Sequence, residues 1–92
     1  MIHARKDYQR FQDPAVDDPT LLGEGCTPIA EDEPVMLFRA KDKHFLNVLI
    51  DYFHHLRMDP NVDKKMLDAI AEHSNLAAEW QNKNGTKTPD IP

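Results

Sequence analysis

The sequence contains a single cysteine, Cys26, among its 92 residues. One cysteine excludes an internal disulfide, and a lone thiol is typical of proteins that remain in a reducing compartment. A domain of this length buries only roughly 60–65% of the surface that its unfolded chain exposes. Because no disulfide supports so thin a core, the usual remaining sources of stability are a metal ion or a partner chain.

Long apolar stretches are also missing. The longest ones, residues 35–38 and 48–50, fall far short of the roughly 20 residues that a membrane-spanning helix needs. Residues 1–11 lack the apolar segment of a signal peptide. The sequence therefore predicts a cytoplasmic protein that makes no contact with a membrane.

Glycine is scarce as well, and three glycines cannot form a phosphate-binding loop of the usual kinds. No serine or cysteine has the sequence context of an activated nucleophile. Asp51, His54 and His55 have a spacing that can place metal ligands on one side of a helix. A bundle-type metal site repeats such a set on a second helix, and residues 68–73 offer it only at the wrong spacing. We therefore expect no enzymatic activity, no metal site and no cofactor.

Basic residues are outnumbered, with 11 Lys and Arg against 16 Asp and Glu, which gives a net charge of −5. Proteins that bind duplex nucleic acid directly need clustered Lys and Arg to contact phosphates. The charge balance argues against that class. An acidic surface keeps a small protein soluble, and it can also bind a basic surface on another protein.

The prolines divide the chain, because proline interrupts both helix interiors and central strands. Four lie within residues 14–34, two lie within residues 89–92, and only Pro60 lies between these groups. We expect residues 1–34 to form an extended arm that wraps the core, orders on a partner or stays partly disordered. Residues 35–84 are predicted to form a single small helical domain, and residues 85–92 an exposed tail.

Residues 35–40 form a short apolar run that begins after Pro34 and ends in polar residues. This run predicts a strand at about residues 35–40. The alternative is a first helix that starts at Pro34. We favour the strand because the polar residues 39–44 would interrupt the apolar stripe of such a helix.

A first helix is predicted at about residues 43–58, with Asp42 as its N-cap. Its apolar residues occupy much more than one-third of the helix circumference. They are Phe45, Leu46, Val48, Leu49, Ile50, Tyr52, Phe53 and Leu56. A single hairpin cannot cover so much apolar surface, so we expect the arm or a second copy to do so, and we predict a homodimer or a higher oligomer.

A second helix is predicted at about residues 60–84. Asp59 followed by Pro60 is a typical helix start, and Asn84 followed by Gly85 is a typical end. The short connection favours an antiparallel helical hairpin, which makes the fold class mainly α. The predicted inner stripe consists of Val62, Met66, Ile70, His73, Ala77 and Trp80.

Two sets of charged residues are candidate binding sites. A basic cluster just before the first helix could bind a small anion, because helix N-termini and arginine side chains favour phosphate or carboxylate groups. The alternatives are a solvated basic patch or internal ion pairs with residues 31–33. The basic cluster comprises Arg39, Lys41, Lys43 and His44, and the carboxylates that could meet a basic partner are Asp17, Asp18, Glu31, Asp32 and Glu33.

Residues 32–42 read Asp-Glu-Pro-Val-Met-Leu-Phe-Arg-Ala-Lys-Asp. This stretch resembles the pattern D-E-P-V-x-x-x-R-A-x-D of a group of small uncharacterised phage and prophage proteins, in which two helices follow and the second ends near a tryptophan. The resemblance covers about residues 29–82. That group has no assigned activity, so the resemblance implies no functional residue.

Small acidic phage proteins as a class often act by binding a host protein. We therefore expect an accessory protein of the host cytoplasm that binds a host macromolecule, as a host-takeover factor or an anti-defence inhibitor. The alternative is a homo-oligomeric binding protein that sequesters a small anionic or nucleotide ligand. A virion or assembly component is a third possibility.

Overall fold

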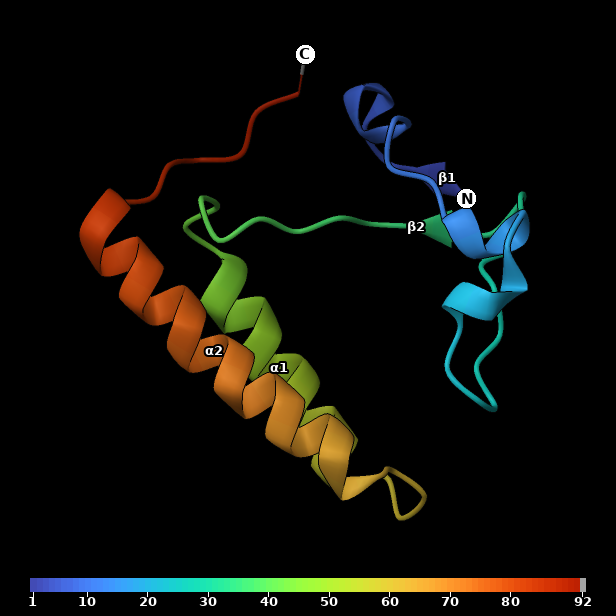
Figure 1. Cartoon of the computed structure of the whole chain (residues 1–92). Helices are drawn as coiled ribbons and strands as arrows, with labels where there is room; N and C mark the ends of the chain where they lie inside the picture. The colour runs from blue at the N-terminus through green and yellow to red at the C-terminus, as the bar shows by residue number, and fades with distance from the viewer. Residues whose placement is uncertain (92) are drawn as a thin grey trace. The chain divides into compact units, whose positions relative to one another are not determined.

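A computed structural model describes residues 1–91 of the chain. They divide into two compact units, Met1–Leu37 together with Ile91, and Phe38–Asp90. Figure 1 shows the first unit as short turns and loops and the second as a pair of helices. Neither helix in this part of the chain is long and apolar enough to cross a membrane.

The first unit contains two very short strands and three short 3₁₀ helices. Strand β1 (Ile2–His3) pairs in parallel with β2 (Pro34–Val35), so that Ile2 lies opposite Pro34. The 3₁₀ helices are η1 (Lys6–Tyr8), η2 (Pro14–Val16) and η3 (Pro19–Leu21). The predicted arm is therefore folded into successive turns between its two strands.

Tyr8 forms the centre of the small core of this unit, together with Ala15 and His3. The Tyr8 ring makes edge-to-face contacts with His3 and with Phe11. The imidazole Nε2 of His3 lies 2.6 Å from the carbonyl oxygen of Phe11, a hydrogen-bond distance. These contacts hold the turn at η1 against β1.

The predicted strand at residues 35–40 is wrong in extent, because β2 covers only Pro34–Val35. Its partner β1 is two residues long, so residues 36–40 have no strand to pair with. Met36, Leu37 and Phe38 are exposed. An apolar run indicates a strand only where a partner strand of matching length is available.

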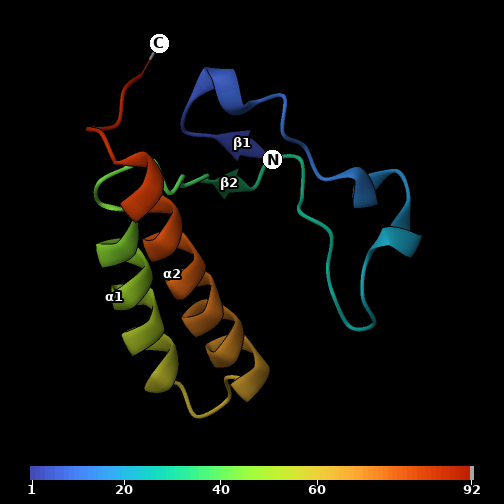
Figure 2. The ribbon, with the colours of Figure 1, turned by 60° about the vertical axis from the view of Figure 1, so that its left-hand side comes forward.

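The second unit consists of α1 (Phe45–Arg57) and α2 (Lys64–Asn84). The two helices lie side by side and run in opposite directions, as Figures 1 and 2 show. This arrangement is compatible with the predicted helical hairpin. Gly85 ends α2 with a positive φ of 71°, and its N–H donates to Gln81 O, which confirms the predicted stop.

Both predicted helix starts are wrong by a few residues. Asp42 does not cap α1, because its carboxylate accepts a hydrogen bond from His44 N–H in the preceding turn. Asp59 does not cap α2, since its carboxylate accepts from Asn61 N–H and so stabilises a turn in the connection. The N-cap of α2 is Asp63, whose carboxylate accepts from Lys65 N–H at 2.9 Å. In both cases an aspartate that can cap a helix caps a turn instead.

The inner face of α2 is also rotated from the predicted one. Ile70 and Ala77 lie towards α1 as predicted, whereas Met66, His73 and Trp80 are exposed. Polar side chains take their places, because their hydrogen-bonding groups are satisfied locally: Ser74 Oγ donates to Ile70 O, and Gln81 Nε2 donates to Ala40 O. The buried and half-buried residues of α2 are Leu67, Ile70, Ser74, Ala77 and Gln81.

The segment after α2 pairs with the segment before α1. Lys87 N–H donates to Lys41 O at 2.8 Å, and Lys43 N–H donates to Lys87 O at 3.0 Å. Asp42 and Lys87 thereby form an isolated parallel bridge. These bonds join the entry and the exit of the hairpin.

Candidate functional site

The two units differ sharply in charge. Met1–Leu37 contains eight carboxylates and three basic side chains, whereas Phe38–Asp90 contains eight of each. The net charge of −5 therefore resides in the first unit. Between Arg10 and Arg39 the chain has seven carboxylates and no Lys or Arg. We refer to residues 13–33, which carry these carboxylates, as the acidic segment.

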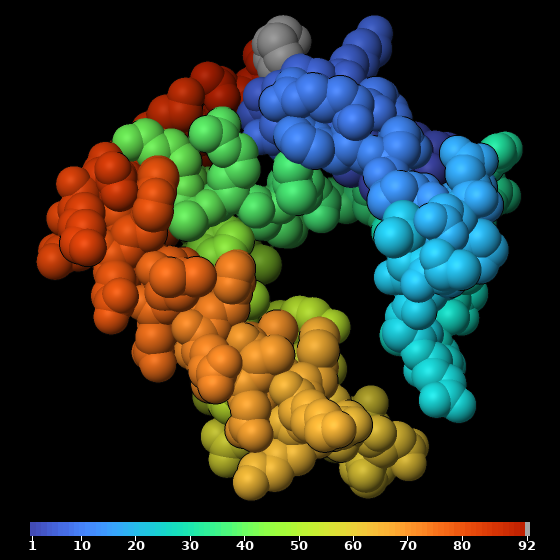
Figure 3. All heavy atoms as spheres, viewed as in Figure 1, coloured from blue at the N-terminus to red at the C-terminus, as the bar shows by residue number. Residues whose placement is uncertain are grey.

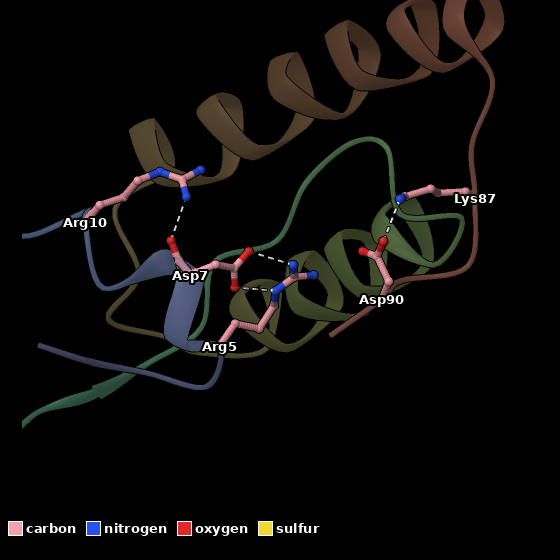
Figure 4. A network of polar contacts seen from close by, with 5 residues as sticks. All are labelled: Arg5, Asp7, Arg10, Lys87 and Asp90. Carbon is pink, nitrogen blue, oxygen red and sulfur yellow. Dashed lines mark hydrogen bonds and ion pairs between the residues drawn. The ribbon is translucent and has the colours of Figure 1, made fainter. Parts of the chain in front are cut away.

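Both arginines of the first unit make contacts with nearby residues, as Figure 4 shows. Arg5 donates two hydrogen bonds to the carboxylate of Asp7, at 3.0 and 2.7 Å, and stacks over the Tyr8 ring. Arg10 donates to Asp7 O at 2.7 Å and lies over the Phe11 ring. The hydrogen bonds from Arg5 hold the pKa of Asp7 below its ordinary value. The acidic segment itself contains no Lys or Arg.

Asp13 fixes the base of the acidic segment. One carboxylate oxygen accepts from Ala15 N–H at 3.0 Å and caps η2, and the other accepts from Ile29 N–H at 2.9 Å. The bond from Ile29, followed by the bond from Ala15, holds the pKa of Asp13 below its ordinary value of 3.8. The carboxylate thus joins two positions that are 16 residues apart in the chain. Figure 3 shows part of the intervening segment, coloured cyan, as a projecting loop.

The predicted partner-binding carboxylates divide into two groups. Asp17, Glu31, Asp32 and Glu33 are exposed, and within residues 1–91 their side chains take part in no hydrogen bond or ion pair. Asp18 is exposed too, but its carboxylate accepts from the N–H and the hydroxyl of Thr20 and caps η3. Four of the five predicted side chains are therefore available to a partner, and the fifth supports the loop.

The predicted anion-binding residues are not all available. Lys41 Nζ donates to Asn84 O at 3.0 Å and to Gly85 O at 3.4 Å, and it lies 5.9 Å from the Trp80 ring centre. An ammonium group at this position satisfies terminal carbonyls and complements the negative end of the α2 dipole. The structure thus places Lys41 at the end of α2 rather than at the start of α1.

Arg39, Lys43 and His44 are exposed, and their side chains take part in no hydrogen bond, ion pair or ring contact within the described part of the chain. Two surface depressions formed by described residues lie elsewhere and include none of these side chains. One is lined by residues 2–4 and 34–36, and the other by residues of both helices. Anion binding by Arg39, Lys43 and His44 stays a prediction.

No group of three His, Cys, Asp or Glu side chains within residues 1–91 lies close enough to hold a metal ion. His3 is the one side chain in this range with a buried polar atom, Nδ1, that has no hydrogen-bond partner. It lines the depression beside β1 and β2.

Sequence reasoning missed two features of this surface: the arginine contacts around Asp7, and the bond between Asp13 and Ile29. The sequence gives no clear signal for the arginine contacts, because Arg5 and Asp7 are two residues apart and lack the three- or four-residue spacing by which ion pairs are recognised on a helix. The second feature had a partial signal, since Asp followed by Pro at positions 13–14 and again at 18–19 is typical of a capped turn. The pairing with Ile29 depends on the path of the loop, which the local pattern does not contain.

Comparison of the chain with protein-family models, with curated proteins and with solved structures found no match.

Proposed function

We propose that this chain is a small phage-type accessory protein that acts by binding a host macromolecule through its acidic segment. The observation that carries the proposal is the segregation of charge. One unit accounts for the whole net charge of −5, and its acidic segment contains seven carboxylates and no Lys or Arg. A charge of one sign, gathered on one short segment, attracts a partner of the opposite sign and speeds their encounter.

The local structure of the segment supports binding to a partner. The carboxylates of Asp13 and Asp18 accept hydrogen bonds from the backbone N–H groups of Ala15, Ile29 and Thr20 and so hold the backbone in place. The remaining carboxylates then project from an ordered loop. A surface that is ordered before binding loses less conformational entropy in the complex, so more of its interaction energy contributes to affinity.

The chemistry of the segment defines the class of partner. Exposed carboxylates recognise clustered Lys and Arg, and such clusters occur on proteins that themselves bind polyanions. We therefore propose that the partner is a host nucleic-acid-binding protein, and that this chain covers its basic groove. Covering that groove would block access of the nucleic acid, which is how a host-takeover or anti-defence inhibitor of this class would act.

The test is a pull-down from host lysate with the immobilised full-length chain at low salt, followed by binding measurements with the purified partner. We expect a stoichiometric host protein, and we expect the double variant Asp17→Asn/Asp32→Asn to bind it several-fold more weakly. Each removed carboxylate deletes an attraction at the rim of the interface, where single charge pairs contribute roughly 0.2–1 kcal/mol.

The matched control is Asp51→Asn/Asp68→Asn, which removes the same two charges from exposed positions on the helices. The control should bind the partner as tightly as the unmodified chain. Equal weakening by both double variants would mean that only the total charge matters. Failure to recover any stoichiometric protein at low salt would contradict the proposed function.

A further inference from the structure

Helix α2 carries two stripes of mostly apolar residues rather than one. Its inner stripe, which begins at Leu67 and ends at Gln81, packs on α1. A second stripe lies beside the first, about one-quarter of a turn away, and its residues also alternate in steps of three and four. Steps of three and four along a helix are the spacing of a helix–helix seam. The members of this outer stripe are Met66, Ala69, His73, Leu76 and Trp80.

The outer stripe is exposed and contains no Asp, Glu, Lys or Arg. Met66 and Trp80 expose 40% of their surface and Leu76 exposes 60%. Helix α1 adds Val48 and Tyr52, which expose 40% and 44%. They lie on the same side of the hairpin, because their helical positions follow that of Phe45, whose ring contacts the His73 ring edge-to-face. We call these residues together the outer face.

We propose that the outer face packs against the outer face of a second copy of this chain, so that two hairpins form a four-helix bundle. Within Phe38–Asp90 the buried apolar residues are Phe45 and Ala77 alone, apart from half-buried ones. A pair of helices with so small a core needs further apolar burial to be stable. Two identical faces, apolar apart from His73 and the Lys41 ammonium that lies over the Trp80 ring, provide it symmetrically in a two-fold dimer.

Charge supports a second copy of this chain as the occupant. The hairpin unit has equal numbers of basic and acidic side chains, so two hairpins approach without net repulsion. An antiparallel α2–α2 pairing that places Met66 against Leu76 of the second copy also places Lys65 beside Glu79 of that copy, twice by symmetry. Glu72 then meets Glu72 of the second copy near the two-fold axis. The two attractive pairs outnumber this single repulsion.

The test is the mass of the full-length chain in solution, measured by sedimentation equilibrium. We expect twice the monomer mass for the unmodified chain and the monomer mass for Leu76→Glu, with unchanged helical circular dichroism. Leu76 is mostly exposed within one chain, so the substitution should leave the hairpin itself folded. The matched control is Asn75→Glu, one residue away on the other side of α2, which should remain a dimer.

A second variant checks the orientation of the pairing. Glu72→Gln removes the repulsion at the axis and should tighten the dimer several-fold. Asp68→Asn removes the same charge one helical turn earlier, farther from the outer stripe, and should change the dissociation constant much less. A monomeric unmodified chain, a dimer that persists in Leu76→Glu, or a Glu72→Gln dimer that is no tighter would each overturn the proposal. None of these outcomes bears on binding by the acidic segment, which lies in the other unit.

Discussion

At the scale of single residues, some charged side chains of this molecule bond to the backbone and others are left exposed to solvent. Asp13, Asp18 and Lys41 bond to backbone groups and hold local structure. The side chains of Asp17 and Asp32 take part in no hydrogen bond or ion pair within residues 1–91. The sequence does not show which of these five charged side chains bonds to the backbone, because whether a charged group meets a backbone N–H or carbonyl depends on the path of the chain. Exposure of the acidic segment was therefore predictable, and the structural roles of Asp18 and Lys41 were not.

Asp13 provides a pH-dependent prediction at this scale. Its pKa in the folded chain lies below its ordinary value of 3.8, so the contribution of its carboxylate to stability is fully present above pH 3.8 and is lost as the pH falls through the folded-state pKa. We expect the Ile29 amide to be protected from hydrogen exchange at neutral pH and to lose that protection in acid. Asp13→Asn should lower the protection at neutral pH already.

The control for this measurement is Asp17→Asn, which removes the same charge from a side chain that makes no bond within the described residues. It should leave the exchange of the Ile29 amide unchanged. Undiminished protection of Ile29 in Asp13→Asn would show that the amide is held by something other than this carboxylate.

At the scale of elements, the two helices, their hairpin connection and the end of α2 could be predicted from residue patterns. The start of α2 could not, because both Asp59 and Asp63 have the side chain of an N-cap and only one can serve. The inner face was ambiguous for a related reason. The stripe through Met66 and Trp80 is as regular as the true one, and the true one includes the polar residues Ser74 and Gln81, whose local hydrogen bonds a pattern cannot reveal.

The corrected helix start can be tested directly. Asp63→Ala removes the N-cap of α2 and should lower the free energy of unfolding by about 1 kcal/mol, within the roughly 0.5–2 kcal/mol range of such substitutions. Asp59→Ala removes only a turn bond in the connection and should cost less. Urea denaturation followed by circular dichroism at 222 nm measures both losses of stability. A larger loss for Asp59→Ala would show that Asp59 is the N-cap and that α2 begins at Pro60.

At the scale of the whole molecule, the acidic unit and the neutral hairpin unit are each suited to a different kind of interaction. The acidic segment would bind through charge, and the outer face of the hairpin would bind through apolar burial. Salt screens the first kind and does not weaken the second. Sequence composition gave the total charge, but the division of that charge between a neutral unit and an acidic one became clear only with the unit boundary at Leu37.

We therefore predict opposite salt responses for the two proposed complexes. Raising the salt from about 0.1 to about 1 M shortens the screening length from roughly 10 to roughly 3 Å, which should weaken binding to the host partner severely. The same change should leave the homodimer intact. Titration of both equilibria across this range, by fluorescence anisotropy and by sedimentation, checks the prediction, and a dimer that dissociates in salt would argue against an apolar interface.

The backbone bonds between Lys41, Lys43 and Lys87 have one more consequence. They keep the entry and the exit of the hairpin next to each other, while the connection between α1 and α2 closes its far end. A segment whose two ends lie next to each other can be inserted into a surface loop of an unrelated protein without distorting that protein, because the two joined positions stay close together. Residues 41–87 are therefore suited to insertion into another protein, and a recipient protein that carries them in a surface loop should keep its own fold.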